Sequence, residues 1–267
     1  MLVRGTHRPA AQEHCAIAVM AKASHPGRTK TRLSPPLSLT QAAELNTAFL
    51  CDIADNLSLA AQRADIDCFM AFGPPGSAAF FEHHLPAHVG LLEAWLPNFG
   101  DCLFHTVRSL LDCGYGAACV LNSDSPTLPT EVLVQAAQSL RLPGDRLVAG
   151  PCTDGGYYLL GMKRPHRRLF EEVAWSTGQV FAQTRSRAAE LRLDCALLTP
   201  WYDVDDAASL AVLTGELLSR RRFSADHASY DAMHTTAVLR RQAVDGAPAR
   251  DAVLDADPPS AALSPPA

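Results

Sequence analysis

The stretch that decides the fold is A-I-A-V-M-A-K-A-S-H-P-G-R-T-K-T-R-L, residues 16–33. Its apolar run, residues 16–20, stops before Lys22, and a Pro-Gly turn follows at residues 26–27. A continuous apolar run bounded by Pro and Gly is typical of a buried parallel strand. The stretch therefore predicts a strand of a parallel sheet that leads directly into a loop.

This loop concentrates positive charge beside a glycine. Lys22, Arg28, Lys30 and Arg32 are four cations within eleven positions. Guanidinium and ammonium groups bind phosphate well, and Gly27 would let the backbone approach an anion closely. A solvated basic turn is the alternative, and the loop alone does not decide between the two interpretations.

The composition limits the class of protein. A chain of 267 residues can bury a full core, and its net charge of −5 argues against a general nucleic-acid binder. The sequence has no apolar run long enough to cross a bilayer and no signal-peptide core at its N-terminus. The eight cysteines form no C-x-x-C pair, so neither a zinc site nor a disulfide framework is expected. We expect a cytoplasmic protein without a membrane span or a nucleic-acid partner, whose ligand is a small anion.

Strand-like and helix-like segments alternate along the chain. A capping box, Ser38-x-x-Gln41, predicts the start of a long helix, and Thr130 is a plausible cap for a later one. The expected helices cover residues 38–64, 100–113, 130–140, 178–191 and 206–222, the last of these being the final helix. The expected strands after the first cover residues 68–72, 89–92, 117–121, 147–149, 157–162 and 195–198. This alternation predicts an α/β fold with a mostly parallel sheet flanked by helices.

The same pattern predicts the domain organisation. Residues 15–242 are expected to form a single domain, preceded by a flexible lead-in at residues 1–14. Residues 243–267 are dominated by Pro, Ala and Asp and are expected to be a disordered tail.

Several charged segments follow strands of the predicted sheet. Ligands of such sheets bind beyond the carboxyl ends of the strands. The basic loop, Asp124 and Asp154 each come directly after a predicted strand. We therefore expect them to meet in space although they are far apart in the sequence.

Two acidic segments are candidate metal ligands. Asp124 lies in N-S-D-S-P, residues 122–126, and Asp203 and Asp205 would point the same way from an extended segment. Mg²⁺ or Mn²⁺ is commonly held by one or two such carboxylates together with phosphate oxygens. For Asp124 the alternative is a turn aspartate that accepts backbone N–H groups. Asp206 is more plausible as the N-cap of the next helix.

A third segment combines a carboxylate, glycines and aromatic residues. In Asp154-Gly155-Gly156-Tyr157-Tyr158 the glycines would let a substrate lie against the backbone, with Asp154 as its polar contact. A tight hairpin is the alternative interpretation. For Trp175 two interpretations also stay open, because it could pack in the core or cover a ligand.

The order of these motifs resembles one bacterial transferase family. It is the GT-A-like, nucleotide-diphospho-sugar transferase family associated with radical-SAM proteins and arsenosugar biosynthesis, usually classified as glycosyltransferases. The matching segments are M-A-K-A-S-H-P-G-R-T-K-T-R-L (20–33), N-S-D-S-P-T-L-P (122–129), G-P-C-T-D-G-G-Y-Y-L-L-G (150–161), W-S-T (175–177) and D-V-D-D (203–206). More distantly, D-S-P-T-L-P and D-G-G are similar to segments of molybdenum-cofactor and phospholactate guanylyltransferases.

The resemblance, which spans about residues 16–218, implies a three-layer Rossmann-like GT-A fold with the nucleotide over the carboxyl edge of its sheet. It also implies that Lys22, Lys30 and Arg32 hold phosphates, and that Asp124 with Asp203 or Asp205 holds Mg²⁺. The chain departs from the family pattern at Asn122, where a Gly is usual. It departs again at residues 97–103, where only Gly100, Asp101 and Leu103 match clearly.

These observations leave three functions open. In glycosyl transfer from a nucleotide-sugar, Mg²⁺ on Asp124 would neutralise the departing diphosphate, with Lys30 and Arg32 beside it and Asp154 on the substrate. In nucleotidyl transfer, the loop cations, Arg28 among them, would bind an NTP, with Gly27, Gly155 and Gly156 giving backbone access. A nucleotide-binding protein without activity is the third. The long match favours glycosyl transfer to a small-molecule acceptor.

Overall fold

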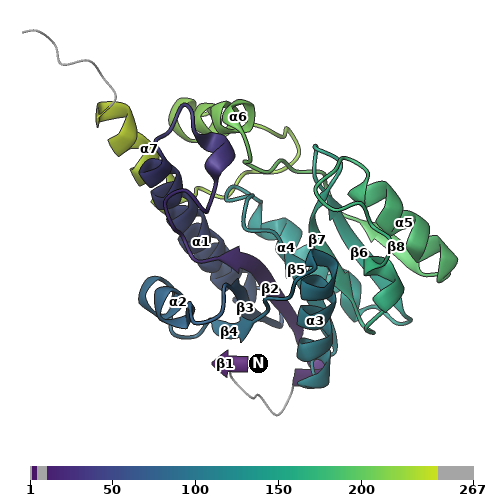
Figure 1. Ribbon diagram of the computed structural model, residues 1–267. Coiled ribbons are helices and arrows are strands. Elements are labelled where there is room, and N and C mark those ends of the chain that lie inside the picture. Colours follow the sequence, from purple (N-terminus) through teal and green to yellow (C-terminus); the bar gives the residue numbers. More distant parts are fainter. Residues whose placement is uncertain (1, 5–10, 246–267) are drawn as a thin grey trace, which may run out of the picture.

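The structure, a computed structural model, describes residues 2–4 and 11–245. Within them the strands form one eight-stranded sheet of order β1-β4-β3-β2-β5-β7-β6-β8 (Figure 1). The strands are β1 (Leu2–Arg4), β2 (Cys15–Lys22), β3 (Ile66–Gly73), β4 (Gly90–Glu93), β5 (Ala117–Leu121), β6 (Arg146–Pro151), β7 (Tyr157–Met162) and β8 (Asp194–Leu197). The helices are α1 (Leu39–Ala61), α2 (Ala78–His84), α3 (Phe99–Asp112), α4 (Thr130–Arg141), α5 (Val180–Glu190), α6 (Ala207–Ser219) and α7 (Met233–Asp245).

The sheet is mixed but mostly parallel, as the sequence predicts. Strand β2 lies at its centre and pairs in parallel with both β3 and β5. Strand β7 runs antiparallel to β5 and β6, and β1 runs antiparallel to β4. The β6–β7 pair is therefore a hairpin, and its turn contains the D-G-G segment for which a hairpin was one interpretation.

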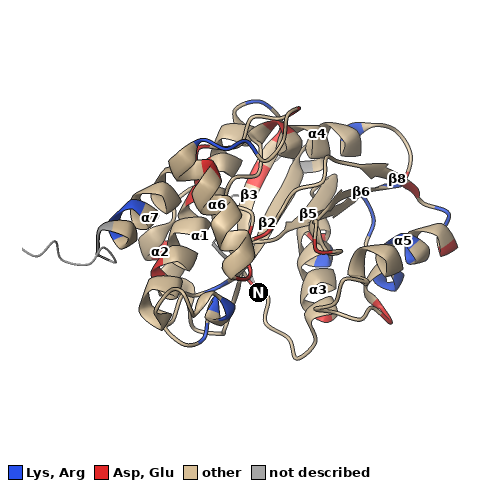
Figure 2. Ribbon diagram, turned by 90° about the horizontal axis from the view of Figure 1, so that it is seen from above, with Lys and Arg blue, Asp and Glu red and all other residues tan. Residues whose placement is uncertain are grey.

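Helices cover both faces of the sheet, which gives three layers. Looking down on the molecule, α4 lies on one side of the strands and α3 and α5 lie on the other (Figure 2). A hydrophobic core lies on each face of the sheet. Successive residues of β2 belong to these two cores alternately, because neighbouring side chains of a strand point to opposite faces. Ile17 and Val19 belong to the core under α1 and α4, whereas Ala16 and Ala18 belong to the core under α3. The predicted α/β class with a three-layer Rossmann-like arrangement is confirmed.

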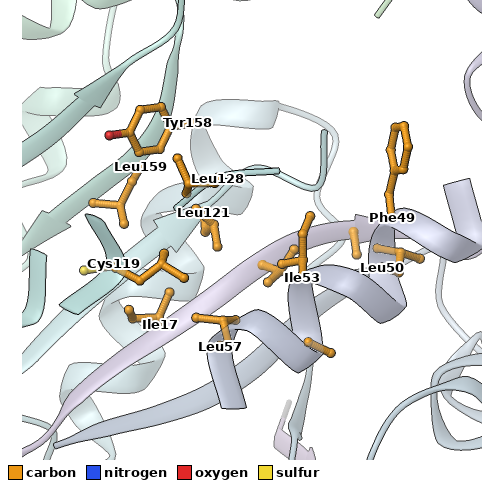
Figure 3. Close-up of a cluster of buried hydrophobic side chains, with 14 of the residues drawn as sticks. Ile17, Phe49, Leu50, Ile53, Leu57, Cys119, Leu121, Leu128, Tyr158 and Leu159 are labelled. Atoms are coloured by element: carbon orange, nitrogen blue, oxygen red, sulfur yellow. The ribbon is translucent and has the colours of Figure 1, made fainter. Parts of the chain in front are cut away.

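The long helix α1 shows how local sequence produces this packing. The Ser38 hydroxyl accepts the Gln41 backbone N–H, and the Gln41 side chain accepts the Ser38 backbone N–H, so the predicted capping box is formed. Leu45, Phe49, Ile53 and Leu57, which recur at helical spacing along α1, are buried in the same core. Figure 3 labels side chains of this core, among them Ile17 of β2, Cys119 and Leu121 of β5, Leu159 of β7, and Leu50, Ile53 and Leu57 of α1.

Helix α7 was not expected, because we predicted that the helix beginning near Asp206 would be the last. Asp52, a fully buried residue of α1, accepts the backbone N–H groups of His234 (2.9 Å) and Thr235 (2.7 Å) at the start of α7. A carboxylate from a distant helix thus satisfies the free N–H groups at this helix terminus.

Two smaller expectations also differ from the structure. Thr130 is the first residue of α4 and not its cap; the N-cap is Pro129, and the Thr130 hydroxyl donates to Asn56 Oδ1 at 2.6 Å. Within the expected flexible lead-in, Leu2–Arg4 forms the edge strand β1.

In the described part of the chain, no helix combines the length and apolar character that a membrane span requires. Residues 246–267, most of the predicted tail, lie outside the described residues.

Candidate functional site

The carboxyl ends of the central strands open into a cavity of about 590 Å³. Lys22 ends β2, Asp124 follows β5, and Asp154 follows β6, so all three lie at the same edge of the sheet. Most of the residues that we expected to meet do line this cavity, namely Lys22, Arg28, Lys30, Arg32, Asp124, Asp154, Gly156, Asp203 and Asp205. The topology therefore brings the basic loop and the carboxylates together.

Gly27 and Gly155 are the two candidate residues that do not line the cavity. Both have a positive φ, +75° for Gly27 and +92° for Gly155, which favours glycine. A Cβ on Gly155 would lie 2.2 Å from the Gly178 carbonyl oxygen, so this position also needs glycine for close backbone packing. These glycines shape the loops that carry the lining residues.

Backbone hydrogen bonds hold the second acidic segment against the other two. The Val204 N–H donates to the Asp124 carbonyl oxygen at 2.8 Å, and the Thr153 N–H donates to the Trp201 carbonyl oxygen at 3.0 Å. Residues 201–205 therefore lie beside both the Asp124 loop and the β6–β7 turn, which places Asp203 and Asp205 at the cavity.

Lys30 forms the polar centre of this arrangement. Its Nζ donates to Asp124 Oδ1 (2.7 Å), Asp205 Oδ1 (2.9 Å) and the Val204 carbonyl oxygen (2.7 Å). Burial lowers the pKa of Lys30, but the two carboxylates outweigh it, so the pKa lies above its ordinary value of 10.5. All three ammonium protons are used within the protein, so contact with a phosphate requires Lys30 to exchange a partner.

Asp203 and Asp154 form a second acidic pair. One carboxylate oxygen of each lies within 4.8 Å of the other and of Cys152 Sγ. Burial, followed by the negative charge of Asp154 and the other carboxylates, raises the pKa of Asp203 to about 7. Two of the four aspartates are paired with Lys30 and the other two form the second acidic pair, so the excess negative charge is suited to a divalent cation.

The donor set favours a hard cation. Mg²⁺ and Mn²⁺ prefer carboxylate oxygens, and burial followed by the nearby carboxylates raises the pKa of the Cys152 thiol. Cys152 therefore stays protonated beside the two aspartates. Asn122, one of the departures from the family pattern, adds a buried Oδ1 that has no hydrogen-bond partner among the described residues.

Besides Lys30, three cations from the end of β2 and the loop after it line the cavity. Arg28 and Arg32 are exposed, and within the described ranges no carboxylate oxygen lies within 4.0 Å of either guanidinium. The Lys22 ammonium lies 5.4 Å from the centre of the Trp95 ring. These groups are therefore available to an anionic ligand.

Aromatic side chains also line the cavity, and sequence reasoning missed two of them. Trp95 follows β4, Phe99 begins α3, and Trp175, for which the sequence left two interpretations open, precedes α5. The ring centres of Phe99 and Trp175 lie 5.4 Å apart in an edge-to-face arrangement. The position of Trp95 just after a strand, at the edge where ligands bind, was the signal that could have identified it.

Comparisons with known proteins find a partial family match and solved structures of similar fold. Residues 56–177, less than half of the chain, match the model of a family described as "Uncharacterized protein conserved in bacteria (DUF2064)". A protein of Desulfovibrio desulfuricans G20, described provisionally as a nucleotide-diphospho-sugar transferase, has a similar crystal structure. The TM-score is 0.72 at 26% identity, over 86% of this chain and 95% of that one.

A CMP:2-keto-3-deoxy-manno-octonic acid synthetase complexed with CTP shares the fold. Its TM-score is 0.51 at 11% identity, over 78% of this chain and 100% of that one. The search of curated proteins found no match.

Proposed function

We propose that this chain is a divalent-cation-dependent transferase that moves a sugar from a nucleotide-sugar to a small acceptor. The observation that carries the proposal is the cavity itself, which is lined both by four carboxylates and by the available cations Lys22, Arg28 and Arg32. A diphosphate together with its metal ion matches both groups of charges. The 26% identical protein described provisionally as a nucleotide-diphospho-sugar transferase supports the same class. An association with radical-SAM proteins and arsenosugar biosynthesis stays a prediction.

The residues present fit Mg²⁺ or Mn²⁺. Asp203 is the ligand we favour most, because it lies near Asp154 and carries a carboxyl group that its neighbours repel. Asp154 would be its partner. Asp124 and Asp205 are the other candidate ligands, and their use requires Lys30 to move away from them. When bound, the metal ion would neutralise charge on the leaving diphosphate.

The loop residues would hold the donor. Arg28 and Arg32 can bind phosphate oxygens through two N–H groups each, and Lys22 adds a point charge at the end of β2. Lys30 would hold Asp124 and Asp205 in place before the donor binds, and would become a phosphate ligand on exchange. Preorganised charges of this kind stabilise the negative charge that develops on the leaving group.

Nucleotidyl transfer is the second candidate. It is favoured by the number of unpaired loop cations, since Lys22, Arg28 and Arg32 together suit a triphosphate. The products separate the two reactions: glycosyl transfer releases a nucleoside diphosphate, whereas nucleotidyl transfer releases pyrophosphate.

The experiment incubates the full chain and Mg²⁺ with a panel of sugar nucleotides and NTPs, and measures both products. We expect release of a nucleoside diphosphate from at least one sugar nucleotide. Pyrophosphate release from an NTP instead would establish the second candidate. Binding without release of either product would mean that the protein binds nucleotides but does not catalyse.

Variants identify the metal ligands. Calorimetric titration with Mn²⁺ is expected to show binding that Asp203→Asn abolishes and that Asp112→Asn, at an exposed carboxylate of α3, leaves unchanged. Loss of binding in Asp154→Asn but not in Asp124→Asn would support the Asp154–Asp203 pair. The reverse result would assign the metal to Asp124 and would show that Lys30 moves on binding.

A further inference from the structure

Two segments with no assigned role, residues 97–103 and the W-S-T motif, meet on one side of the cavity. Phe99 and Trp175 form an aromatic wall there, with their rings 5.4 Å apart at 86°. A Cβ on Gly100 would lie 2.9 Å from Trp175 Nε1, so glycine at this position lets the indole pack against the start of α3. Residues 97–103, which depart from the family pattern, therefore hold Phe99 and Trp175 in contact.

Part of this aromatic wall is exposed to solvent. Phe99 is 52% exposed although it is a large apolar side chain at the mouth of a cavity. Among the described residues, no group accepts a hydrogen bond from the Trp175 indole N–H. An exposed aromatic face beside a free donor is suited to a ligand with an apolar ring face and hydroxyl groups at its edge.

The wall adjoins the Asp154 end of the cavity. Gly178, three residues after Trp175, packs against the backbone of Asp154 and Gly155. Tyr157, which follows the same turn, also lines the cavity. A ring that rests on the wall would therefore have the carboxylates within reach of its hydroxyl groups.

The distribution of charge indicates what kind of molecule fits there. The cations that line the cavity are Lys22, Arg28, Lys30 and Arg32, and all of them come from β2 and the loop after it. Around the wall, the lining residues are aromatic, small or polar, and the nearest ionised group on the same turn is Asp154. An anionic acceptor held on Phe99 and Trp175 would lie beside the carboxylate of Asp154, which is unfavourable in a partly buried site.

We propose that the aromatic wall selects a neutral alcohol with a ring, such as a sugar or cyclic polyol, as the acceptor. This inference rests on the proposed glycosyl transfer. The acceptor hydroxyl oxygen forms the new bond to the sugar carbon of the donor. The bond from that carbon to the diphosphate oxygen breaks, and its electron pair leaves with the nucleoside diphosphate. The hydroxyl proton passes to one of the site carboxylates.

The test compares neutral cyclic alcohols (myo-inositol and methyl glucoside) with acyclic acids (glycerate and 3-phosphoglycerate). Transfer is measured with the sugar nucleotide that the chain turns over, and binding is measured separately by calorimetry in the presence of the nucleoside diphosphate. The variants are Phe99→Ala and, as a control, Leu142→Ala, whose side chain is 51% exposed outside the cavity. Hydrolysis of the donor without acceptor reports on the proposed function alone.

We expect a cyclic alcohol to be the better acceptor and Phe99→Ala to raise its KM about tenfold. Acceptor KM, donor KM and donor hydrolysis are expected to be unchanged in Leu142→Ala, which lies outside the cavity. Better use of an acyclic acid, or an unchanged acceptor KM in Phe99→Ala, would overturn the inference. If no donor is turned over, the proposed function fails, and the calorimetry alone then tests whether the wall binds a cyclic alcohol. Binding of a cyclic alcohol that weakens in Phe99→Ala supports the wall, and its absence refutes it.

Discussion

Replacing Lys30 by Met tests the charge arrangement of the site. The Lys30 side chain is only 7% exposed, and the substitution keeps its aliphatic part but removes the ammonium group. Asp124 and Asp205 then lose their cationic partner, and the Val204 carbonyl oxygen loses its donor. The two carboxylates remain partly exposed, 28% and 46%, so water replaces part of what is lost.

The size of the effect follows from these contacts. A hydrogen bond to a charged group is worth about 1.5–3 kcal/mol when buried, and partial exposure lowers each of the three to about 1 kcal/mol. We therefore expect Lys30→Met to reduce the free energy of unfolding by about 3 kcal/mol, which lowers Tm by about 6–12 °C for a domain of this size.

The pH dependence of this contribution has a definite sign. Because the folded pKa of Lys30 lies above 10.5, its stabilisation is complete below that pH and is lost as pH rises through the folded pKa. The difference in Tm between the native chain and the variant should therefore be constant near neutral pH and shrink only in strong alkali.

The assay is thermal unfolding followed by circular dichroism, with and without millimolar Mn²⁺. Lys163→Met is the matched control, because its ammonium donates to one carbonyl oxygen at 3.0 Å near the surface. Mn²⁺ should stabilise Lys30→Met more than the native chain, since the cation can then use Asp124 and Asp205. A Tm within about 2 °C of the control, which is the scatter expected for surface substitutions, would refute the reasoning.

Three other substitutions have expected outcomes in thermal unfolding. Asp203→Asn should stabilise the metal-free protein at pH 8 by about 2 kcal/mol, because it removes a carboxylate that burial and its neighbours disfavour; a lower Tm would contradict this. Gly155→Ala should cost at least about 1 kcal/mol more than Gly144→Ala, because both have a positive φ but only Gly155 faces a backbone carbonyl oxygen; equal costs would exclude the close approach. Asp52→Ala should cost about 1–2 kcal/mol by freeing the N-terminus of α7, whereas Asp55→Ala, at a surface pair, should cost less; the opposite order would show that Asp52 does not cap the helix.

Elements whose signals are local were predictable from the sequence. The strands at residues 117–121 and 157–162 have the predicted bounds, because short apolar runs there end at polar or glycine-containing segments. The capping box of α1 and the cap at Asp206 also formed as expected, since each depends on residues within one helical turn.

Elements that depend on distant partners were not predictable. Helix α7 has a weak apolar pattern, and the carboxylate at its start comes from Asp52, 182 residues before His234. Strand β1 is three residues long and is defined by its pairing with β4. Neither partner can be identified from the local sequence alone.

The candidate site likewise has one feature that was predictable from the sequence and one that was not. Its location followed from strand order, because residues after parallel strands share one edge of the sheet. Its internal pairing did not, since Lys30 adopts a positive φ of 52° and reaches two carboxylates that we had expected to hold the metal ion. The pairing of Asp154 with Asp203 depends on the bridge between Cys152 and Trp201, which is a tertiary contact.

The most direct test of the shared site is the affinity of a nucleoside diphosphate, measured by calorimetry with and without Mn²⁺. If the carboxylates and the loop cations together hold a metal-bound diphosphate, Mn²⁺ should raise the affinity of the native chain at least about tenfold, or 1.4 kcal/mol, and have no effect on Asp203→Asn. An affinity that is the same with and without Mn²⁺, or an equal rise in Asp203→Asn, would contradict the account.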